Sequence, residues 1–456
     1  MTLRFGTDGI RGVAGVDLTP ELVAAIGRAA ARVLGPDVAL VIARDTRLSG
    51  PTLEAALTVG LRIEGASAVS LGVLPTPGLA FVCRERAAPG AMISASHNPF
   101  PDNGVKFFTS DGRKLSDERE RDVEQELERV LGEGPGAAVG GDVGGDVDGA
   151  VAEYDAGPTV LAARDRYVQH LVDATEGRRL DGLRVVVDCG HGAAFEVAPR
   201  ALRELGVDVS VLNAEPDGTN INAGCGSTDP SGLQQAVVHR GAHAGLAFDG
   251  DADRVIAIDE GGGIVDGDQL LAIAALDLTR RGLLRGGVVA TVMSNLGLRR
   301  VLNAHGIRLV ETPVGDRNVI AAMEAEVISL GGEQSGHVIF SDLATTGDGT
   351  LTGILLLDVV ARAKQPLSTL ASVMTRFPQV LRNVRVAARD RLDDAAGFWA
   401  EVRSVEAELG GEGRVLVRSS GTEPVVRIMV EAPTDERAEA GAQRLAAALE
   451  GALGRG

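Results

Sequence analysis

The sequence predicts an α/β protein of several domains, and three observations support this. Short apolar runs alternate with stretches of helical periodicity from the N-terminus to about residue 96. A chain of 456 residues is longer than a domain with a single hydrophobic core usually is, so two to four domains are expected. Apolar residues make up 45% and charged residues 24% of the chain, as in globular proteins.

The first domain begins with a helix after Leu18. Thr19 is a suitable N-cap, Pro20 suits the first turn, and apolar residues then recur at helical spacing. A strand is expected over residues 38–43, a helix over 51–64 and a second strand over 68–71. The apolar run of residues 90–93 predicts a buried strand that ends in a tight turn at Ser96.

Three further units follow. Residues 131–150 are rich in Gly and Asp and predict a surface connection. A second α/β cycle starts near Tyr167, with strands expected at 183–188 and 207–212, and a third starts near Val255, with strands at 287–292 and 307–312. A break at 362–366 precedes a smaller α+β unit, with strands at 384–386, 414–417 and 425–430 and helices at 393–409 and the C-terminus. We therefore expect domains at 1–150, 151–254, 255–366 and 367–456.

Composition excludes several classes of partner. The net charge of −18 disfavours nucleic acid and anionic membrane surfaces, which would be repelled. Cys83, Cys189 and Cys225 are odd in number and have no CxxC spacing, so neither a disulfide framework nor a zinc ribbon is expected. No secretory h-region is present, and no apolar run approaches about 20 residues. We expect a soluble, cytoplasmic protein.

Ser96 is the first candidate functional residue. The turn of residues 94–99, with a hydroxyl at the end of an apolar strand, is where active sites of α/β proteins tend to lie. A serine hydroxyl alone is a weak nucleophile and needs a partner, and such a segment is equally typical of a capped turn. Lys106, one of only three lysines, follows shortly after and is a candidate proton-transfer group or phosphate counter-charge.

An acidic triplet, Asp249, Asp251 and Asp253, suggests a site for a hard divalent cation. An EF-hand is excluded because its sixth loop position, which requires glycine, is Arg254, and because a strand follows. A solvated acidic turn remains an alternative. So does an aspartyl-phosphate phosphotransferase with Asp249 as the nucleophile, in which Ser96 would have no role.

Two later loops carry groups suited to a sugar phosphate. Residues 332–337 place Glu333, Ser335 and His337 among glycines, which allow close backbone approach to a sugar. The segment from Arg418 to Arg427 combines two arginines with hydroxyls and a glycine, a natural receptor for a phosphate monoester. Both patterns also occur in ordinary turns. The sequence has neither a P-loop nor a dinucleotide fingerprint.

Together these motifs resemble the α-D-phosphohexomutase superfamily over nearly the whole chain. The resemblance also includes residues 5–12, Asp45-Thr46-Arg47 and residues 103–108. Gln334 and the run Gly421-Thr422-Glu423-Pro424 resemble the branch that acts on glucosamine phosphates. Residues 140–149 and 155–163 fit the family's connection between domains one and two poorly, and His191 is unusual, so we expect it to be structural.

The resemblance implies four domains around a central cleft, namely three related α/β mixed-sheet domains and a smaller α+β C-terminal domain. It implies that Ser96 is a phosphoserine, that Mg²⁺ is bound by Ser96 and the three aspartates, and that a hexose 1,6-bisphosphate is the primer and intermediate. The implied activity converts glucosamine 6-phosphate into glucosamine 1-phosphate, which feeds UDP-N-acetylglucosamine synthesis. A homodimer is one possible assembly.

The resemblance also implies roles for individual residues. The catalytic set is Ser96, Lys106, His337 and Arg11, and the substrate-binding set is Glu333, Ser335, Arg254, Arg418, Ser420, Gly421, Thr422 and Arg427. Two alternatives stay open. One is a phosphomannomutase or phosphoglucomutase of the same superfamily, and the other is a non-catalytic sugar-phosphate binding protein.

Overall fold

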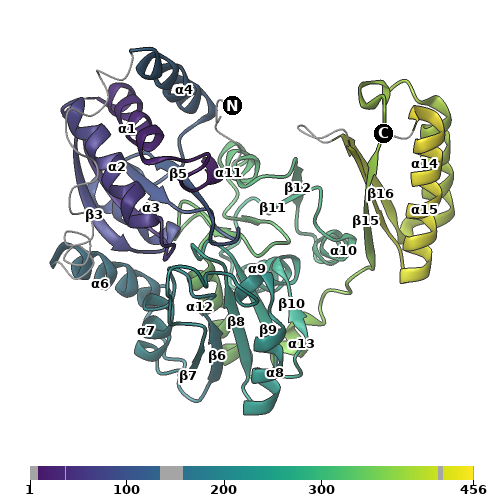
Figure 1. Ribbon diagram of the computed structural model, residues 1–456. Coiled ribbons are helices and arrows are strands. Elements are labelled where there is room, and N and C mark those ends of the chain that lie inside the picture. Colours follow the sequence, from purple (N-terminus) through teal and green to yellow (C-terminus); the bar gives the residue numbers. More distant parts are fainter. Residues whose placement is uncertain (1–8, 36, 134–157, 420–424, 455–456) are drawn as a thin grey trace. The chain divides into compact units, whose positions relative to one another are not determined.

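The computed structural model describes residues 9–35, 37–133, 158–419 and 425–454 (Figure 1). They form two compact units, which are described separately. The first comprises Met1–Val292 and Val310–Ala371, and the second comprises Met293–Leu309 and Ser372–Gly456. The predicted surface connection at 131–150 begins at the end of a helix and otherwise lies outside the described residues.

The first domain contains a five-stranded mixed sheet of order β1-β5-β4-β2-β3. Its elements are β1 (Ile10–Val13), α1 (Pro20–Leu34), β2 (Ala39–Arg44), α2 (Gly50–Ile63), β3 (Ser67–Val73), α3 (Thr76–Arg86), β4 (Gly90–Ile93), β5 (Asp102–Phe108) and α4 (Asp117–Gly132). Strands β2, β3 and β4 are parallel, whereas β5 and β1 add in antiparallel orientation. Helices α1, α2 and α4 share one apolar core with the sheet. The predicted cap is confirmed, because Thr19 accepts a hydrogen bond from the Leu22 amide.

The second domain repeats this arrangement in the order β10-β9-β8-β6-β7. Its elements are α6 (Pro158–Asp173), β6 (Arg184–Asp188), α7 (Val197–Glu204), β7 (Asp208–Leu212), α8 (Ser231–Arg240), β8 (Ala244–Phe248), β9 (Val255–Asp259) and β10 (Ile264–Val265). The structure differs here from the expected start of the third domain at Val255. Strand β9 pairs with β8 in antiparallel register, so the acidic triplet lies inside a hairpin of the second sheet. A hairpin keeps both of its strands in one sheet, which moves the end of this domain beyond β10.

The third domain has a four-stranded sheet of order β12-β11-β13-β14. Its elements are α9 (Gly267–Arg280), β11 (Val288–Thr291), β12 (Leu309–Thr312), α11 (Asp316–Ala325), β13 (Leu330–Gly332), β14 (Val338–Phe340), α12 (Gly349–Ala363) and the short α13 (Leu367–Ala371). Strand β13 is parallel to β11 and antiparallel to β14. A small apolar cluster packs α11 against this sheet, with Val319 and Met323 from the helix.

All three sheets therefore end their parallel part with an antiparallel hairpin: β4–β5, β8–β9 and β13–β14. The three hairpin loops occupy equivalent positions in the three domains. They contain Ser96, the acidic triplet and the Glu333–His337 segment, respectively. No sequence repeat between the domains shows this equivalence.

The second unit combines a three-stranded antiparallel sheet of order β15-β17-β16 with two long helices. Its elements are α10 (Leu296–Ala304), β15 (Gln379–Arg385), α14 (Ala396–Leu409), β16 (Arg414–Ser419), β17 (Val425–Glu431) and α15 (Asp435–Leu453). Helices α14 and α15 bury Phe398 and Leu445 in a separate core against the sheet. The α10 segment belongs to this unit because the Asn295 amide group donates to the Phe377 carbonyl over 2.9 Å, and the Leu296 amide donates to Glu431 over 3.2 Å.

Two composition-based expectations can be compared with the structure. Cys83, Cys189 and Cys225 are all free thiols and all buried, so they form no disulfide. Among the described helices, none combines the length and apolar character needed to cross a membrane.

Candidate active site

The loop that carries Ser96 is held rigidly from within the first domain. Ser96 is fully buried and has a left-handed backbone with φ of 52°, a conformation that a non-glycine residue keeps only when its surroundings enforce it. Its amide donates to the Ser94 hydroxyl over 2.9 Å, and Ser94 in turn donates to Asp45 over 2.6 Å. The loop is thereby tied to the end of β2.

Arg47 is the main support of this loop. Its guanidinium is fully buried, pairs with Asp45 over 2.8 Å and donates to the carbonyls of Ser96 and Asn98 over 2.9 and 2.8 Å. It also donates to the carbonyls of Pro99 and Asp102. Burial raises the pKa of Asp45, which the Arg47 charge partly opposes. One cation thus fixes three backbone carbonyls of the turn and the carbonyl of Asp102, the first residue of β5.

The structure brings Ser96 and the acidic triplet together. The Ser96 hydroxyl donates to Asp249 Oδ2 over 2.7 Å, and both residues are fully buried. Asp249 follows the last residue of β8, so the hydroxyl of the first domain meets the hairpin loop of the second. The expectation that these distant segments converge is met by this contact.

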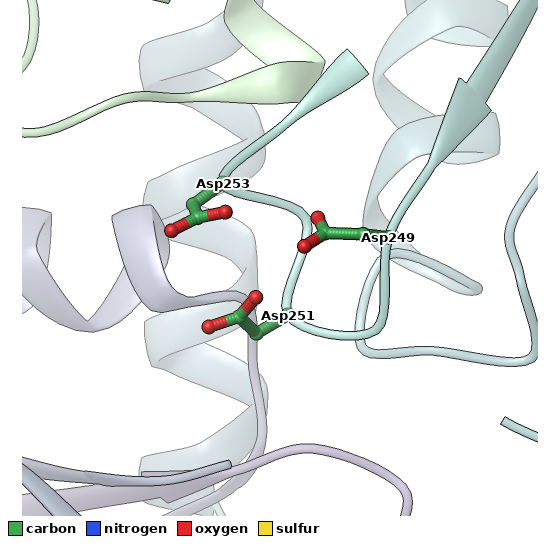
Figure 2. Close-up of side chains that lie close together, drawn as sticks. All are labelled: Asp249, Asp251 and Asp253. Atoms are coloured by element: carbon green, nitrogen blue, oxygen red, sulfur yellow. The ribbon is translucent and has the colours of Figure 1, made fainter. Parts of the chain in front are cut away.

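The three aspartates form a cluster suited to a divalent cation (Figure 2). One carboxylate oxygen from each of Asp249, Asp251 and Asp253 lies within 4.8 Å of the others, and all three residues are buried. Among the described residues, Oδ1 of Asp251 and Oδ1 of Asp253 have no hydrogen-bond partner. Buried, unpaired carboxylate oxygens are costly. These oxygens fit a hard cation such as Mg²⁺.

The electrostatics of the cluster also favour a cation. Burial and the charges of Asp253 and Asp251 raise the pKa of Asp249 to about 8. Burial would raise the pKa of Asp253 as well, but its hydrogen bond with His337 and the nearby cationic groups lower it below its usual range. Without a cation, ionising all three carboxylates together is unfavourable, because the buried negative charges repel one another.

Lys106 lies against the cluster, as its position near Ser96 suggested. Its ammonium group is 3.0 Å from Asp251 Oδ2, and the residue is 2% exposed. Strand β5 places Lys106 directly opposite Met92 of β4, so the lysine and the Ser96 turn come from one hairpin. The same oxygen of Asp251 accepts from the Thr76 hydroxyl over 2.7 Å. The amide of Thr76, the first residue of α3, donates to the Asp251 carbonyl over 3.0 Å.

His337 joins the cluster from the third domain. Its Nδ1 is 3.5 Å from Asp253 Oδ2. Burial alone would lower the pKa of His337, but its interaction with Asp253 raises it above the ordinary value. The Gly347 amide donates to Nε2 over 3.1 Å. In this geometry Nε2 is the acceptor, and Nδ1 is the ring nitrogen that faces Asp253.

Two arginines and one histidine line the side of the cluster that is less deeply buried. Arg254 Nη1 lies 3.2 Å from His97 Nδ1, and His97 Nδ1 lies 3.4 Å from the Ser96 hydroxyl. Burial and the charges of Arg254 and Arg11 lower the pKa of His97. Arg11, on β1, faces Gly104 of β5 in the sheet register. Cationic groups therefore gather beside the Ser96 hydroxyl.

The Glu333–His337 loop lies directly against the hairpin that carries the acidic triplet. The Val255 amide donates to the Gly336 carbonyl over 3.1 Å, and a Cβ on Gly336 would lie 2.0 Å from the Val255 carbonyl oxygen. Only glycine, here at φ of 91°, permits this approach. Glu333 is half-buried and accepts from the Gly315 amide over 3.1 Å, whereas Ser335 is exposed.

The predicted phosphate receptor lies in the second unit. Arg418 of β16 and Arg427 of β17 are opposite each other in the antiparallel register. The predicted residues Ser420, Gly421 and Thr422 lie outside the described residues. Like charges directly opposite each other in a sheet repel, and a bound anion would relieve this repulsion.

Sequence reasoning assigned no role to Arg47, Thr76, His97 or Asn222, although the first and third lie within quoted motifs. The Asn222 amide group donates to the carbonyls of Ser96 and Asn98. Proximity to Ser96 in the chain could have pointed to His97. Thr76 and Asn222 carry no comparable signal. His191 contributes its carbonyl to a hydrogen bond from Thr46, which agrees with a structural role.

Comparison with known proteins gives a consistent result. Models of the phosphoglucomutase/phosphomannomutase family match residues 2–131 as α/β/α domain I, 165–262 as domain II, 266–377 as domain III and 381–448 as the C-terminal domain. The chain is 53% identical to a phosphoglucosamine mutase of Symbiobacterium thermophilum, with 98% of each chain covered. It is 51% identical to a phosphoglucosamine mutase of Thermobifida fusca, again with 98% of each chain covered.

Solved structures agree in fold. A phosphoglucomutase/phosphomannomutase family protein from Burkholderia thailandensis superimposes with a TM-score of 0.77 at 26% identity, covering 99% of this chain and 97% of its own. N-acetylphosphoglucosamine mutase from Aspergillus fumigatus, in complex with GlcNAc-6P and magnesium, gives 0.70 at 20% identity, covering 99% and 96%.

The fold and the site define an enzyme of the phosphohexomutase class, with three related α/β domains and a smaller C-terminal one. The chain belongs to the phosphoglucomutase/phosphomannomutase family. The resemblance predicted from the sequence motifs is thereby confirmed.

Proposed function

We propose that this enzyme interconverts glucosamine 6-phosphate and glucosamine 1-phosphate, with Ser96 as the phosphorylated relay. The observation that carries the reaction type is the buried 2.7 Å contact between the Ser96 hydroxyl and Asp249. The choice of sugar is supported by identities of 50% or more to several phosphoglucosamine mutases over nearly the full chain.

The reaction requires two phosphoryl transfers through one serine. In the first, the C1 hydroxyl of glucosamine 6-phosphate attacks the phosphorus on Ser96, the P–Oγ bond breaks, and the serine oxygen takes up the proton that the sugar hydroxyl loses. The 1,6-bisphosphate then reverses its orientation in the site. In the second transfer, the serine oxygen attacks the phosphorus of the 6-phosphate. The proton returns to the leaving O6, which yields glucosamine 1-phosphate and the phosphoenzyme.

The residues around Ser96 suit these steps. Lys106 and His337 are buried next to the acidic cluster and can hold or move a proton. Arg11 and Arg254 supply positive charge beside the serine, which phosphorylation makes anionic. Ser96 and the three aspartates would hold Mg²⁺, which would offset charge on the transferring phosphoryl group.

Two separate groups of residues would bind the substrate. Glu333 and Ser335 would contact sugar hydroxyls, since their loop lies against the acidic cluster and Ser335 is exposed. Arg418 and Arg427, together with Ser420, Gly421 and Thr422, would bind the phosphate that is not being transferred. Because the sugar binds in two orientations, this receptor must accept either phosphate. Hexose 1,6-bisphosphate would serve as primer, and a homodimer remains a prediction for light scattering to check.

The direct test of the sugar is a comparison of kcat/KM for glucosamine 6-phosphate, mannose 6-phosphate and glucose 6-phosphate, each with Mg²⁺ and its bisphosphate primer. We expect glucosamine 6-phosphate to give the highest value. A higher value for mannose or glucose 6-phosphate would assign the enzyme to the other branch. Binding of glucosamine 6-phosphate without turnover of any of the three sugars would instead support a binding protein.

A further inference from the structure

Asn222 connects the second domain to the Ser96 loop. It lies between β7 and α8 and has a left-handed backbone with φ of 57°. Its side-chain amide donates to the Ser96 carbonyl over 3.0 Å and to the Asn98 carbonyl over 3.2 Å. These two carbonyls flank His97 and define the path of the turn that presents the Ser96 hydroxyl.

The same two carbonyls accept from Arg47 of the first domain, over 2.9 and 2.8 Å. Each carbonyl is therefore held by donors from both domains. Arg47 fixes the turn within its own domain. Asn222 instead fixes it relative to the second domain, which carries the acidic cluster.

The backbone around Asn222 is attached to the strand that precedes this cluster. The Asn222 amide donates to the Gly190 carbonyl over 2.9 Å. Gly190 and the nearby Gly226 pack against the carbonyl of Phe248, to which a Cβ at Gly226 would approach within 2.4 Å. Phe248 is the last residue of β8, and Asp249 follows it. The position of the Asn222 side chain is thus fixed relative to the start of the loop that carries Asp249.

The two loops also leave no space between them at this point. A Cβ on Gly250 would lie 2.5 Å from the Ser96 carbonyl oxygen and 2.9 Å from the Asn222 side-chain nitrogen. The Ser96 carbonyl is therefore enclosed by Gly250, Asn222 and Arg47. A small displacement of this carbonyl would move the Ser96 hydroxyl relative to Asp249.

We propose that Asn222 is a positioning residue that sets the Ser96 hydroxyl against Asp249 across the join between the two domains. It acts through the carbonyls of Ser96 and Asn98 and does not touch the reacting atoms. Phosphoryl transfer requires the attacking and leaving oxygens to lie in line with the phosphorus. Loss of the Asn222 contacts should therefore lower the rate of phosphoryl transfer more than it weakens the affinity for substrate. The proposal rests on the proposed function of Ser96 as the phosphorylated relay.

Two substitutions remove the contact while tolerating the left-handed backbone. Asn222→Gly deletes the amide, and Asn222→Asp is nearly isosteric but places carboxylate oxygens against two carbonyls. We expect kcat of the Mg²⁺-loaded enzyme to fall about 10- to 100-fold for Asn222→Gly and further for Asn222→Asp. KM should stay within about twofold, because the sugar-binding residues are unchanged.

Asn213 offers a matched control in the same domain. It too is an asparagine with a left-handed backbone, at φ of 50°, and its described hydrogen bond uses only its carbonyl. We expect Asn213→Gly to keep the wild-type kcat and, because it loses no described side-chain hydrogen bond, to shift the unfolding midpoint less than Asn222→Gly. Assays run well below both midpoints then separate a positioning effect on kcat from a loss of stability.

A second readout does not depend on turnover. Intact mass should show slower transfer of the phosphate adduct from Ser96 to added sugar phosphate in Asn222→Gly than in wild type. A wild-type rate of adduct transfer and a wild-type kcat in both Asn222 variants would overturn the proposal. The proposed function fails separately, since it requires the wild-type chain itself to carry and transfer the adduct.

Discussion

The Ser96 hydroxyl donates to Asp249 over 2.7 Å, although 153 positions separate the two residues in the chain. Each belongs to the hairpin loop that ends the parallel part of its sheet, in the first and second domains, respectively. The equivalent hairpin loop of the third domain contributes His337 to the same cluster. The candidate catalytic groups therefore meet because three related domains bring the equivalent hairpin loop to one place.

The acidic cluster should bind Mg²⁺ and be stabilised by it. In wild type, Mg²⁺ at about 100 times its dissociation constant should add about 2.7 kcal/mol to the free energy of unfolding. Asn at position 249 cannot act as an anionic ligand, so Asp249→Asn should lose this Mg²⁺-dependent gain, measured as the shift in the thermal midpoint. Removing one of three buried, mutually repelling carboxylates should leave the metal-free variant at least as stable as metal-free wild type.

Asp37→Asn is the control for this experiment, because Asp37 is exposed. It should keep the full Mg²⁺-dependent shift. An equal shift in Asp249→Asn and wild type would show that the cluster is not the magnesium site.

Lys106 should matter for the chemical step. Lys106→Met keeps most of the buried aliphatic volume but removes the ammonium group that lies 3.0 Å from Asp251. We expect kcat to fall about 10²- to 10⁴-fold, the range typical of a lost proton-transfer group. Steady-state assay with Lys364→Met as control measures this, since Lys364 is exposed at the end of α12. A variant that loses only substrate affinity would make Lys106 a binding residue instead.

The sequence predicted much of this site because its main residues stand next to strong local signals. The apolar run before Ser96 and the spacing of Asp249, Asp251 and Asp253 indicate strand ends and a candidate cation site without any knowledge of the fold. Val255 was expected to open the third domain, because a strand's apolar pattern does not show which sheet it joins. That assignment depends on the hairpin pairing of β8 with β9.

The supporting residues could not be predicted in the same way. Arg47 fixes four carbonyls in and next to the Ser96 turn, and carbonyls have no signature in the sequence. Thr76 and Asn222 act between domains, on partners more than 120 positions away. Such roles come from tertiary contacts, and local propensity contains no information about them.

The buried pair of Tyr167 and Asp348 should make stability depend on pH. Tyr167 donates to Asp348 Oδ2 over 2.8 Å, and Asp348 Oδ1 caps α12 by accepting from the Leu351 amide over 2.8 Å. Burial raises the pKa of Asp348 from 3.8 to about 6. The folded state therefore binds this proton more tightly than the unfolded state. The contribution of this carboxyl to the free energy of unfolding is fully present below pH 3.8. It is lost as the pH rises through about 6.

Tyr167→Phe removes the hydroxyl donor that favours the ionised carboxylate. This substitution should lower the free energy of unfolding by about 1.5–3 kcal/mol above pH 6, and by less at lower pH, where Asp348 is protonated. Urea unfolding on both sides of this pH measures the effect. In Asp348→Asn, which keeps a good N-cap without a titrating group, this part of the pH dependence should disappear. A Tyr167→Phe cost that is the same at all pH values would contradict the assignment.

The two opposed arginines of the second unit should bind phosphate. Arg418→Met removes one guanidinium group and its charge-assisted hydrogen bonds to phosphate. KM for glucosamine 6-phosphate should therefore rise about 10- to 100-fold. The stability of the variant should not fall, because the change relieves like-charge repulsion across β16 and β17. Arg385→Met, on the exposed part of β15, is the control and should leave KM unchanged. Unchanged KM in Arg418→Met would remove this arginine from the receptor.

The central claim is that Ser96 carries the phosphoryl group. The most direct measurement is intact mass of the wild type and Ser96→Ala after incubation with Mg²⁺ and glucosamine 1,6-bisphosphate, alongside their turnover of glucosamine 6-phosphate. Ser67→Ala serves as the exposed control. We predict a phosphate adduct and turnover in wild type and in Ser67→Ala, and neither in Ser96→Ala. An adduct or wild-type turnover in Ser96→Ala would contradict the account and point to Asp249 as the phosphorylated residue.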